Sequence, residues 1–247
     1  MKFFFIALGF LTRFPVPRGE VRDERELSGS VIFFPLVGLL LGFVLVLAYA
    51  ALTPFFTERL VNLSIILILI LLTGALHLDG FADTVDGFCS KAKSKEELLR
   101  IMKDSRVGAM GVVGLAMLLL FKYELLNGVA AQQKVPALIM MCSLSRWSQV
   151  LGCRFSVYAR ASEGIGRPFI GNIKHRDFYF ATVCMLVICL IARPVRGMLI
   201  FFLVFASSWM FIKYAHKRIG GMTGDTIGAM SEAAEVLVLL AMQLGAA

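Results

Sequence analysis

The chain has 247 residues, of which 58% are hydrophobic and 17% are charged, and its mean hydropathy is +0.80. Soluble domains are usually about 45–50% apolar and about 25% charged, so this composition excludes a secreted, nucleic-acid-binding or cytosolic protein. The formal net charge of +8 is better explained by Lys and Arg in cytoplasmic loops than by a nucleic-acid surface. We therefore expect a lipid bilayer, and no nucleic acid, as a partner.

The first segment, MKFFFIALGFLTRF, carries a short apolar run after Lys2. No small-x-small cleavage site follows it; Arg13, Pro15, Pro17 and Arg18 follow instead. The pattern predicts a helix that lies in the membrane interface and is retained in the mature protein, with a cleaved signal segment as the alternative.

Seven longer apolar runs come next, most of them close to the roughly 20 residues that a membrane-spanning helix needs. Their bounds are 31–52, 60–78, 107–126, 135–155, 178–192, 197–212 and 227–247. The sequence therefore predicts an all-α, polytopic integral membrane bundle of about seven transmembrane helices, in a single membrane-embedded domain over residues 1–247.

The distribution of Lys and Arg predicts which side of the membrane each loop occupies. With a cytoplasmic N-terminus and seven spans, the inside loops hold 18 basic residues and the outside loops hold four. This positive-inside bias predicts a multi-pass protein of the bacterial cytoplasmic (inner) membrane.

Three aspartates define the most informative segment, HLDGFADTVDG, which begins at His77. Asp79, Asp83 and Asp86 are spaced i, i+4 and i+7, which places them along one face of a helix. Carboxylates at that spacing repel one another unless a cation lies among them, and hard oxygen ligands favour Mg²⁺ or a similar ion. A solvated acidic turn is the simpler alternative. His77 is a weaker catalytic candidate.

Basic residues that suit a phosphate group lie on the same predicted side. Lys103, Asp104 and Arg106 precede a Gly-punctuated helix start at Val107-Gly108-Ala109-Met110-Gly111, whose backbone N–H groups would suit a phosphate. Arg146 within a span, and Arg160 and Arg167 in a Gly-rich loop, are further candidates for binding a charged ligand. For the arginines in loops, the alternative is that they only set the topology.

A third polar set lies at the last predicted span, where Asp225, Glu232 and Glu235 share a face. Each glutamate would cost about 2.5–3.5 kcal/mol if it faced lipid at mid-depth, so both are expected to face the interior and bind metal or cations. Structural pairing with Arg146 is the main alternative. Carboxylates for a divalent metal together with cations for phosphate are the parts of a Mg²⁺-dependent phosphoryl transferase.

Four segments carry a resemblance to a known family: FLTRFPVPR, TGALHLDGFADTVDGF, IMKDSRVGAMG and GGMTGDTIGAMSEAAE. Together and in this order they resemble the cobalamin synthase family, the adenosylcobinamide-GDP ribazoletransferases, across nearly the whole chain. The resemblance implies transfer of the adenosylcobinamide phosphate of adenosylcobinamide-GDP to α-ribazole, or to its 5′-phosphate, with release of GMP at a cytoplasm-facing site.

On this basis we assign roles to the candidates above. We expect Asp79, Asp83 and Asp86 to bind Mg²⁺ on the pyrophosphate, one of these carboxylates or His77 to deprotonate the acceptor, and Lys103 and Arg106 to hold the GMP phosphate. Asp225, Glu232 and Glu235 would complete a second metal site or orient the nucleoside.

Three other functions remain open at this stage. The DG-containing aspartate motif is similar to that of CDP-alcohol phosphotransferases, but the usual AR pair followed by GxxxDxxxD is missing here. A cation-coupled transporter would place its acidic residues near the bilayer midplane and often shows two related halves. A non-catalytic scaffold would not need sets of acidic residues that share one helix face. The sequence leaves oligomeric state open, with a homo-oligomer as one alternative.

Overall fold

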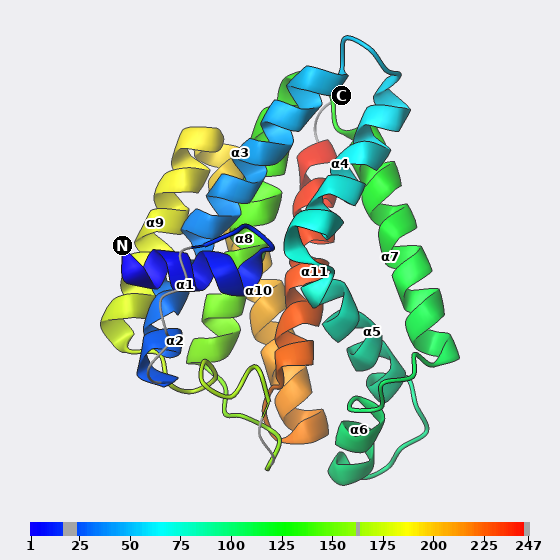
Figure 1. The fold of residues 1–247 in the computed structure, drawn as a ribbon, viewed down its shortest axis with the longest axis vertical. Coiled ribbons are helices and arrows are strands. Elements are labelled where there is room, and N and C mark those ends of the chain that lie inside the picture. The colour runs from blue at the N-terminus through cyan, green and yellow to red at the C-terminus, as the bar shows by residue number, and fades with distance from the viewer. Residues whose placement is uncertain (17–23, 162–163, 245–247) are drawn as a thin grey trace.

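A computed structural model describes residues 1–16, 24–161 and 164–244. In these ranges the chain is helical apart from loops and an isolated bridge between Tyr158 and Met222, which confirms the predicted all-α class (Figure 1). The elements are α1 (Lys2–Leu11), α2 (Glu24–Ser30), η1 (Val31–Phe33), α3 (Phe34–Leu52), α4 (Glu58–Thr73), α5 (Leu76–Phe88), α6 (Lys95–Ile101), α7 (Ala109–Gly128), η2 (Ala131–Gln133), α8 (Lys134–Arg154), α9 (His175–Ala192), α10 (Pro194–Ile219) and α11 (Gly224–Gln243).

Among the described residues, four helices are long and apolar enough to cross a membrane, namely Glu24–Leu52, α7, α9 and α10, and the bent pair of α4 and α5 would make a fifth. The predicted spans 135–155 and 227–247 form α8 and α11, which are not among these candidates; residues 245–247 lie outside the described residues. These helices support the predicted membrane-protein class, and the number of spans, about seven, stays a prediction.

The polarity of α8 is explained by its position at the centre of the bundle. Every residue from Met140 to Cys153 is buried, so its serines, Arg146 and Gln149 contact protein rather than lipid. Helix α3 approaches α8 closely because Gly38 and Gly42 have no side chain. A Cβ at position 38 would lie 2.7 Å from the Cα of Ser143, and one at position 42 would lie 2.7 Å from the Cα of Ile139. Small residues four apart are typical of tightly packed membrane helices.

A sharp break divides the predicted span 60–78 into two helices. Helix α4 ends at Gly74, whose φ is +62°, and Ala75 also has a positive φ, of +58°. A left-handed alanine is strained and needs support from its surroundings. The two helices meet at 92°, so α5 turns away from α4 and packs against the first half of α11 (Figure 1).

The predicted N-terminal helix exists as α1 and lies across the direction of α3 and α8 (Figure 1). Its Ala7, Leu8 and Leu11 are buried, and Lys2 at its start forms a 2.6 Å ion pair with Glu26 of α2. One face of α1 is therefore anchored to the bundle. Its location in the membrane interface stays a prediction.

Candidate active site

Two helices bring three aspartates together at one end of the bundle. Asp79 and Asp83 lie on α5, and Asp225 lies in the first turn of α11. The helices touch at Gly80, where a Cβ would lie 2.8 Å from the Cα of Asp225. Asp83 is half-buried, and its strongest like-charge interaction is with Asp225, followed by Asp79. This mutual repulsion of three carboxylates is the electrostatic condition that favours a bound cation.

The third aspartate of the α5 motif has a different environment. Both carboxylate oxygens of Asp86 accept backbone hydrogen bonds, from the N–H groups of Gly108 and Gly111, at 2.7 Å each. A Cβ at position 108 would lie 2.5 Å from Oδ1 of Asp86, and one at position 111 would also collide with the carboxylate. The helix start that we expected to bind phosphate is thus occupied by Asp86, which attaches α7 to α5.

A cavity that is partly open to solvent, with about 640 Å³ of empty space including that open part, adjoins the aspartates. Asp79 and Asp225 line it, together with His77 and Gln149. His77 is 4% exposed, and its Nε2 lies 3.0 Å from the amide nitrogen of Gln149, which also donates to the Ser231 hydroxyl at 2.8 Å. Nδ1 of His77 has no hydrogen-bond partner. Three carboxylate and imidazole side chains from α5 and α11 therefore share one cavity.

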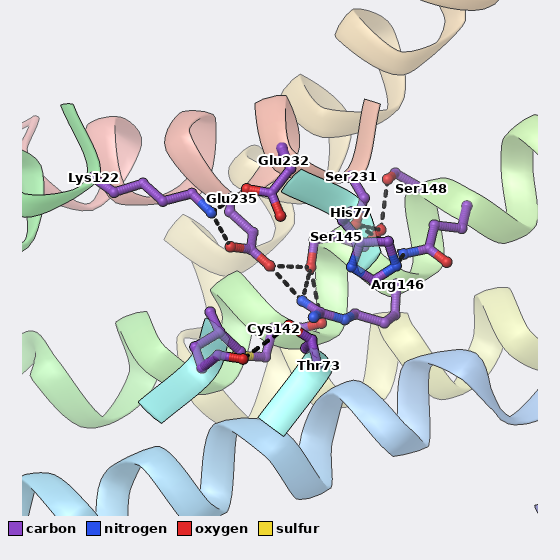
Figure 2. Close-up of polar contacts among 12 residues, drawn as sticks. Thr73, His77, Lys122, Cys142, Ser145, Arg146, Ser148, Ser231, Glu232 and Glu235 are labelled. Carbon is purple, nitrogen blue, oxygen red and sulfur yellow. Dashed lines mark hydrogen bonds and ion pairs between the residues drawn. The ribbon is translucent and has the colours of Figure 1, made fainter. Parts of the chain in front are cut away.

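The two glutamates of α11 lie in a separate, buried network (Figure 2). Lys122 of α7 donates to Glu232 and, at 2.6 Å, to Glu235, and Arg146 of α8 pairs with Glu235. All four side chains are at most 6% exposed. This arrangement matches the alternative of ion pairing. It does not favour Glu232 and Glu235 as metal ligands, or Arg146 as a contact for substrate.

The remaining predicted cations lie around the aspartates or at the surface. Arg160 donates to Asp225 at 2.6 Å, so it neutralises one of the three carboxylates. Lys103 and Arg167 are exposed. Arg106 forms a 2.9 Å ion pair with Asp104, and the hydrogen bonds from Arg106 lower the pKa of that carboxyl to about 2.

The six predicted metal ligands are therefore split among three locations. In the described part of the chain, no three His, Cys, Asp or Glu side chains are grouped closely enough to hold a metal ion by themselves. Mg²⁺ in phosphoryl-transfer sites is usually held by one or two carboxylates together with substrate phosphates, so Asp83 and Asp225, which repel each other, are still a suitable donor set.

Sequence reasoning missed several residues that shape the site. One of them is Lys122, which lies within the predicted span 107–126; a lysine within a span requires an anionic partner, so a signal was available in the sequence. Gln149 and the aromatic residues of the cavity, Phe10, Phe34 and Phe169, come from distant parts of the chain. Nothing in the local sequence indicates that they meet.

Comparison with known proteins gives the family. A model of the family described as cobalamin-5-phosphate synthase matches residues 3–243. The chain belongs to the cobalamin-5-phosphate synthase family. Relatives named adenosylcobinamide-GDP ribazoletransferase include those of Desulforamulus reducens (38% identical, covering 97% of this chain and 95% of the relative), Geotalea daltonii (37%, covering 98% and 97%) and Acetivibrio thermocellus (32%, covering 99% and 98%).

No solved structure matches this member of the cobalamin-5-phosphate synthase family. The match of the family model includes α5, α7 and α11, and with them the three aspartates and the cavity. The resemblance that the four sequence segments indicated is thereby confirmed.

Proposed function

We propose that this protein is an adenosylcobinamide-GDP ribazoletransferase that transfers adenosylcobinamide phosphate to α-ribazole or its 5′-phosphate and releases GMP. The observation that supports this most directly is the convergence of Asp79, Asp83 and Asp225 beside one cavity in a chain that full-length relatives of that name match. A phosphoryl transferase needs little covalent chemistry from the protein and depends on positioning and charge stabilisation.

The reaction is a displacement at phosphorus. The 5′-oxygen of α-ribazole attacks the phosphorus atom that carries cobinamide, a new P–O bond forms, and the anhydride P–O bond breaks so that GMP leaves with the bridging oxygen. Asp79 is exposed and lines the cavity, so we assign it as the base that takes the hydroxyl proton. His77 is less suitable as a base because the Gln149 amide donates toward its Nε2.

Asp83 and Asp225 are the residues we assign to Mg²⁺. When bound there with pyrophosphate oxygens, the ion would offset charge that develops on the leaving phosphate. Arg160 holds the Asp225 carboxylate in place at 2.6 Å, and the exposed Lys103 and Arg167 supply positive charge for the departing GMP. Asp86 is assigned to the attachment of α7 and not to the chemistry.

We further propose that the protein lies in the bacterial cytoplasmic membrane with this site on the cytoplasmic side. The bacterial relatives, the apolar helices and the excess of Lys and Arg in the predicted inside loops support this orientation. Reporter fusions at residues 92 and 105 should give a cytoplasmic signal; a periplasmic signal at either would contradict it.

The decisive experiment is an assay of GMP release by the purified protein in detergent or nanodiscs. We expect GMP and a cobalamin product to form together when adenosylcobinamide-GDP, α-ribazole and Mg²⁺ are all present. Omission of α-ribazole or chelation of Mg²⁺ should abolish both. GMP release that does not depend on α-ribazole would indicate a hydrolase, and flux of a cation into sealed vesicles without GMP release would favour a transporter.

A further inference from the structure

The cavity beside the aspartates has an aromatic wall built from three separate elements. Phe10 comes from α1, Phe34 from the start of α3, and Phe169 from the loop before α9. The ring centroid of Phe10 lies 4.6 Å from that of Phe169 and 6.0 Å from that of Phe34. Rings at these separations and angles form an apolar surface that suits another flat aromatic group.

The polar side chains of the same cavity are few. Besides Asp79 and Asp225 they are His77 and Gln149, and no Lys or Arg belongs to the described residues that line it. His77 is buried, and its Nδ1 lacks a partner. That nitrogen is itself inaccessible, so a ligand in the cavity meets few polar groups of the protein.

We propose that this cavity is the binding site of the acceptor nucleoside, with its aromatic base against Phe10, Phe34 and Phe169 and its 5′ end toward Asp79 and Asp225. The inference rests on the proposed function. The base of α-ribazole is an alkylated benzimidazole, which is largely apolar and has a single unsubstituted ring nitrogen.

The donor substrate also contains an aromatic base, but guanine fits this cavity less well. Guanine carries several donors and acceptors along its edges, and each would lose hydrogen bonds to water on entering an apolar wall. The lining offers His77 and Gln149 for that purpose.

The first test uses Phe10→Leu and Phe169→Leu in the purified full-length protein, with GMP release measured while each substrate is varied in turn. We expect the KM for α-ribazole to rise about three- to tenfold and the KM for adenosylcobinamide-GDP to stay unchanged. Phe202→Leu is the matched control, since Phe202 on α10 is 59% exposed and away from the cavity. A rise confined to adenosylcobinamide-GDP would assign the cavity to the donor and overturn the proposal.

A second measurement needs no variant. In the wild-type protein, free benzimidazole should compete with α-ribazole and guanosine should not; competition by guanosine alone would overturn the assignment.

Equilibrium dialysis of α-ribazole without donor separates the two proposals. Binding without any GMP release in the full assay would refute the proposed function and leave the cavity assignment intact, whereas turnover with an unaltered KM in both Leu variants would refute the cavity assignment alone.

Discussion

The two acidic sets of this protein have opposite environments. Glu232 and Glu235 are sealed in the bundle with Lys122 and Arg146, so that two negative charges face two positive charges (Figure 2). Asp79, Asp83 and Asp225 adjoin a cavity, with Arg160 as the cation in contact with them. The comparison indicates that matched buried charges stabilise the bundle, whereas excess negative charge beside a cavity marks the candidate site.

The largest expected effect comes from neutralising one of the three carboxylates beside the cavity, Asp79, Asp83 and Asp225. Asp83→Asn should reduce GMP release by about 10²–10³-fold, which corresponds to loss of one strong electrostatic contact in a preorganised site, and should leave the thermal stability near that of the wild type. Excess Mg²⁺ should recover part of the activity if Asp83 binds the ion.

The matched control for Asp83→Asn is Asp177→Asn on α9, which lies on another helix and does not line the cavity. It should release GMP at the wild-type rate. Near-normal turnover of Asp83→Asn would remove this carboxylate from the proposed mechanism.

Neutralising one carboxylate of the buried network, in which Glu232 and Glu235 pair with Lys122 and Arg146, should instead lower the stability. Glu235→Gln leaves Lys122 and Arg146 with one carboxylate between them, and breaking a buried pair costs about 3–5 kcal/mol. We expect a markedly lower unfolding temperature in detergent, while the exposed Glu96→Gln should change it little.

A double variant sharpens this test of the network. Lys122→Met together with Glu232→Gln removes one charge of each sign, so it should be less destabilising than Lys122→Met alone. Additive effects of the two changes would show that the buried charges are not coupled.

A smaller effect is expected where Asp86 holds the start of α7. Gly111→Ala would place a Cβ against the Asp86 carboxylate, and overpacking of this kind typically costs about 1–3 kcal/mol. Hydrogen exchange should increase around residues 105–112. Gly114→Ala is the control, because its Cβ would meet only side chains of Val85 and Phe81, at 3.1 Å or more. Equal exchange in both variants would contradict the role assigned to Asp86.

The sequence predicts much of the fold and only part of the site. Apolar runs locate the helices because lipid exposure and burial both require apolar residues. For the same reason they do not show which helices face lipid and which, like the second half of α8, are surrounded by protein. The spacing of Asp79, Asp83 and Asp86 correctly places them on one helix. It does not reveal that Asp86 accepts from Gly108 and Gly111, because that contact depends on how α7 packs.

The smallest expected effect concerns the exposed pair of Asp104 and Arg106, which belongs to neither set. The pKa of Asp104 is lowered to about 2 by the hydrogen bonds from Arg106. A carboxyl with a lowered folded-state pKa contributes its stabilisation above its ordinary pKa and loses it as the pH falls toward 2, so the pair stays intact between pH 5 and pH 8. Arg106 is thus already neutralised throughout the assay range, and exposed pairs of this kind contribute little. Arg106→Ala should raise the KM for adenosylcobinamide-GDP by less than about fivefold, with no change of this ratio between pH 5 and pH 8. A larger or pH-dependent rise would show that Arg106 leaves Asp104 to hold the GMP phosphate, and Lys103→Ala, which removes an exposed cation from the same turn, provides the comparison.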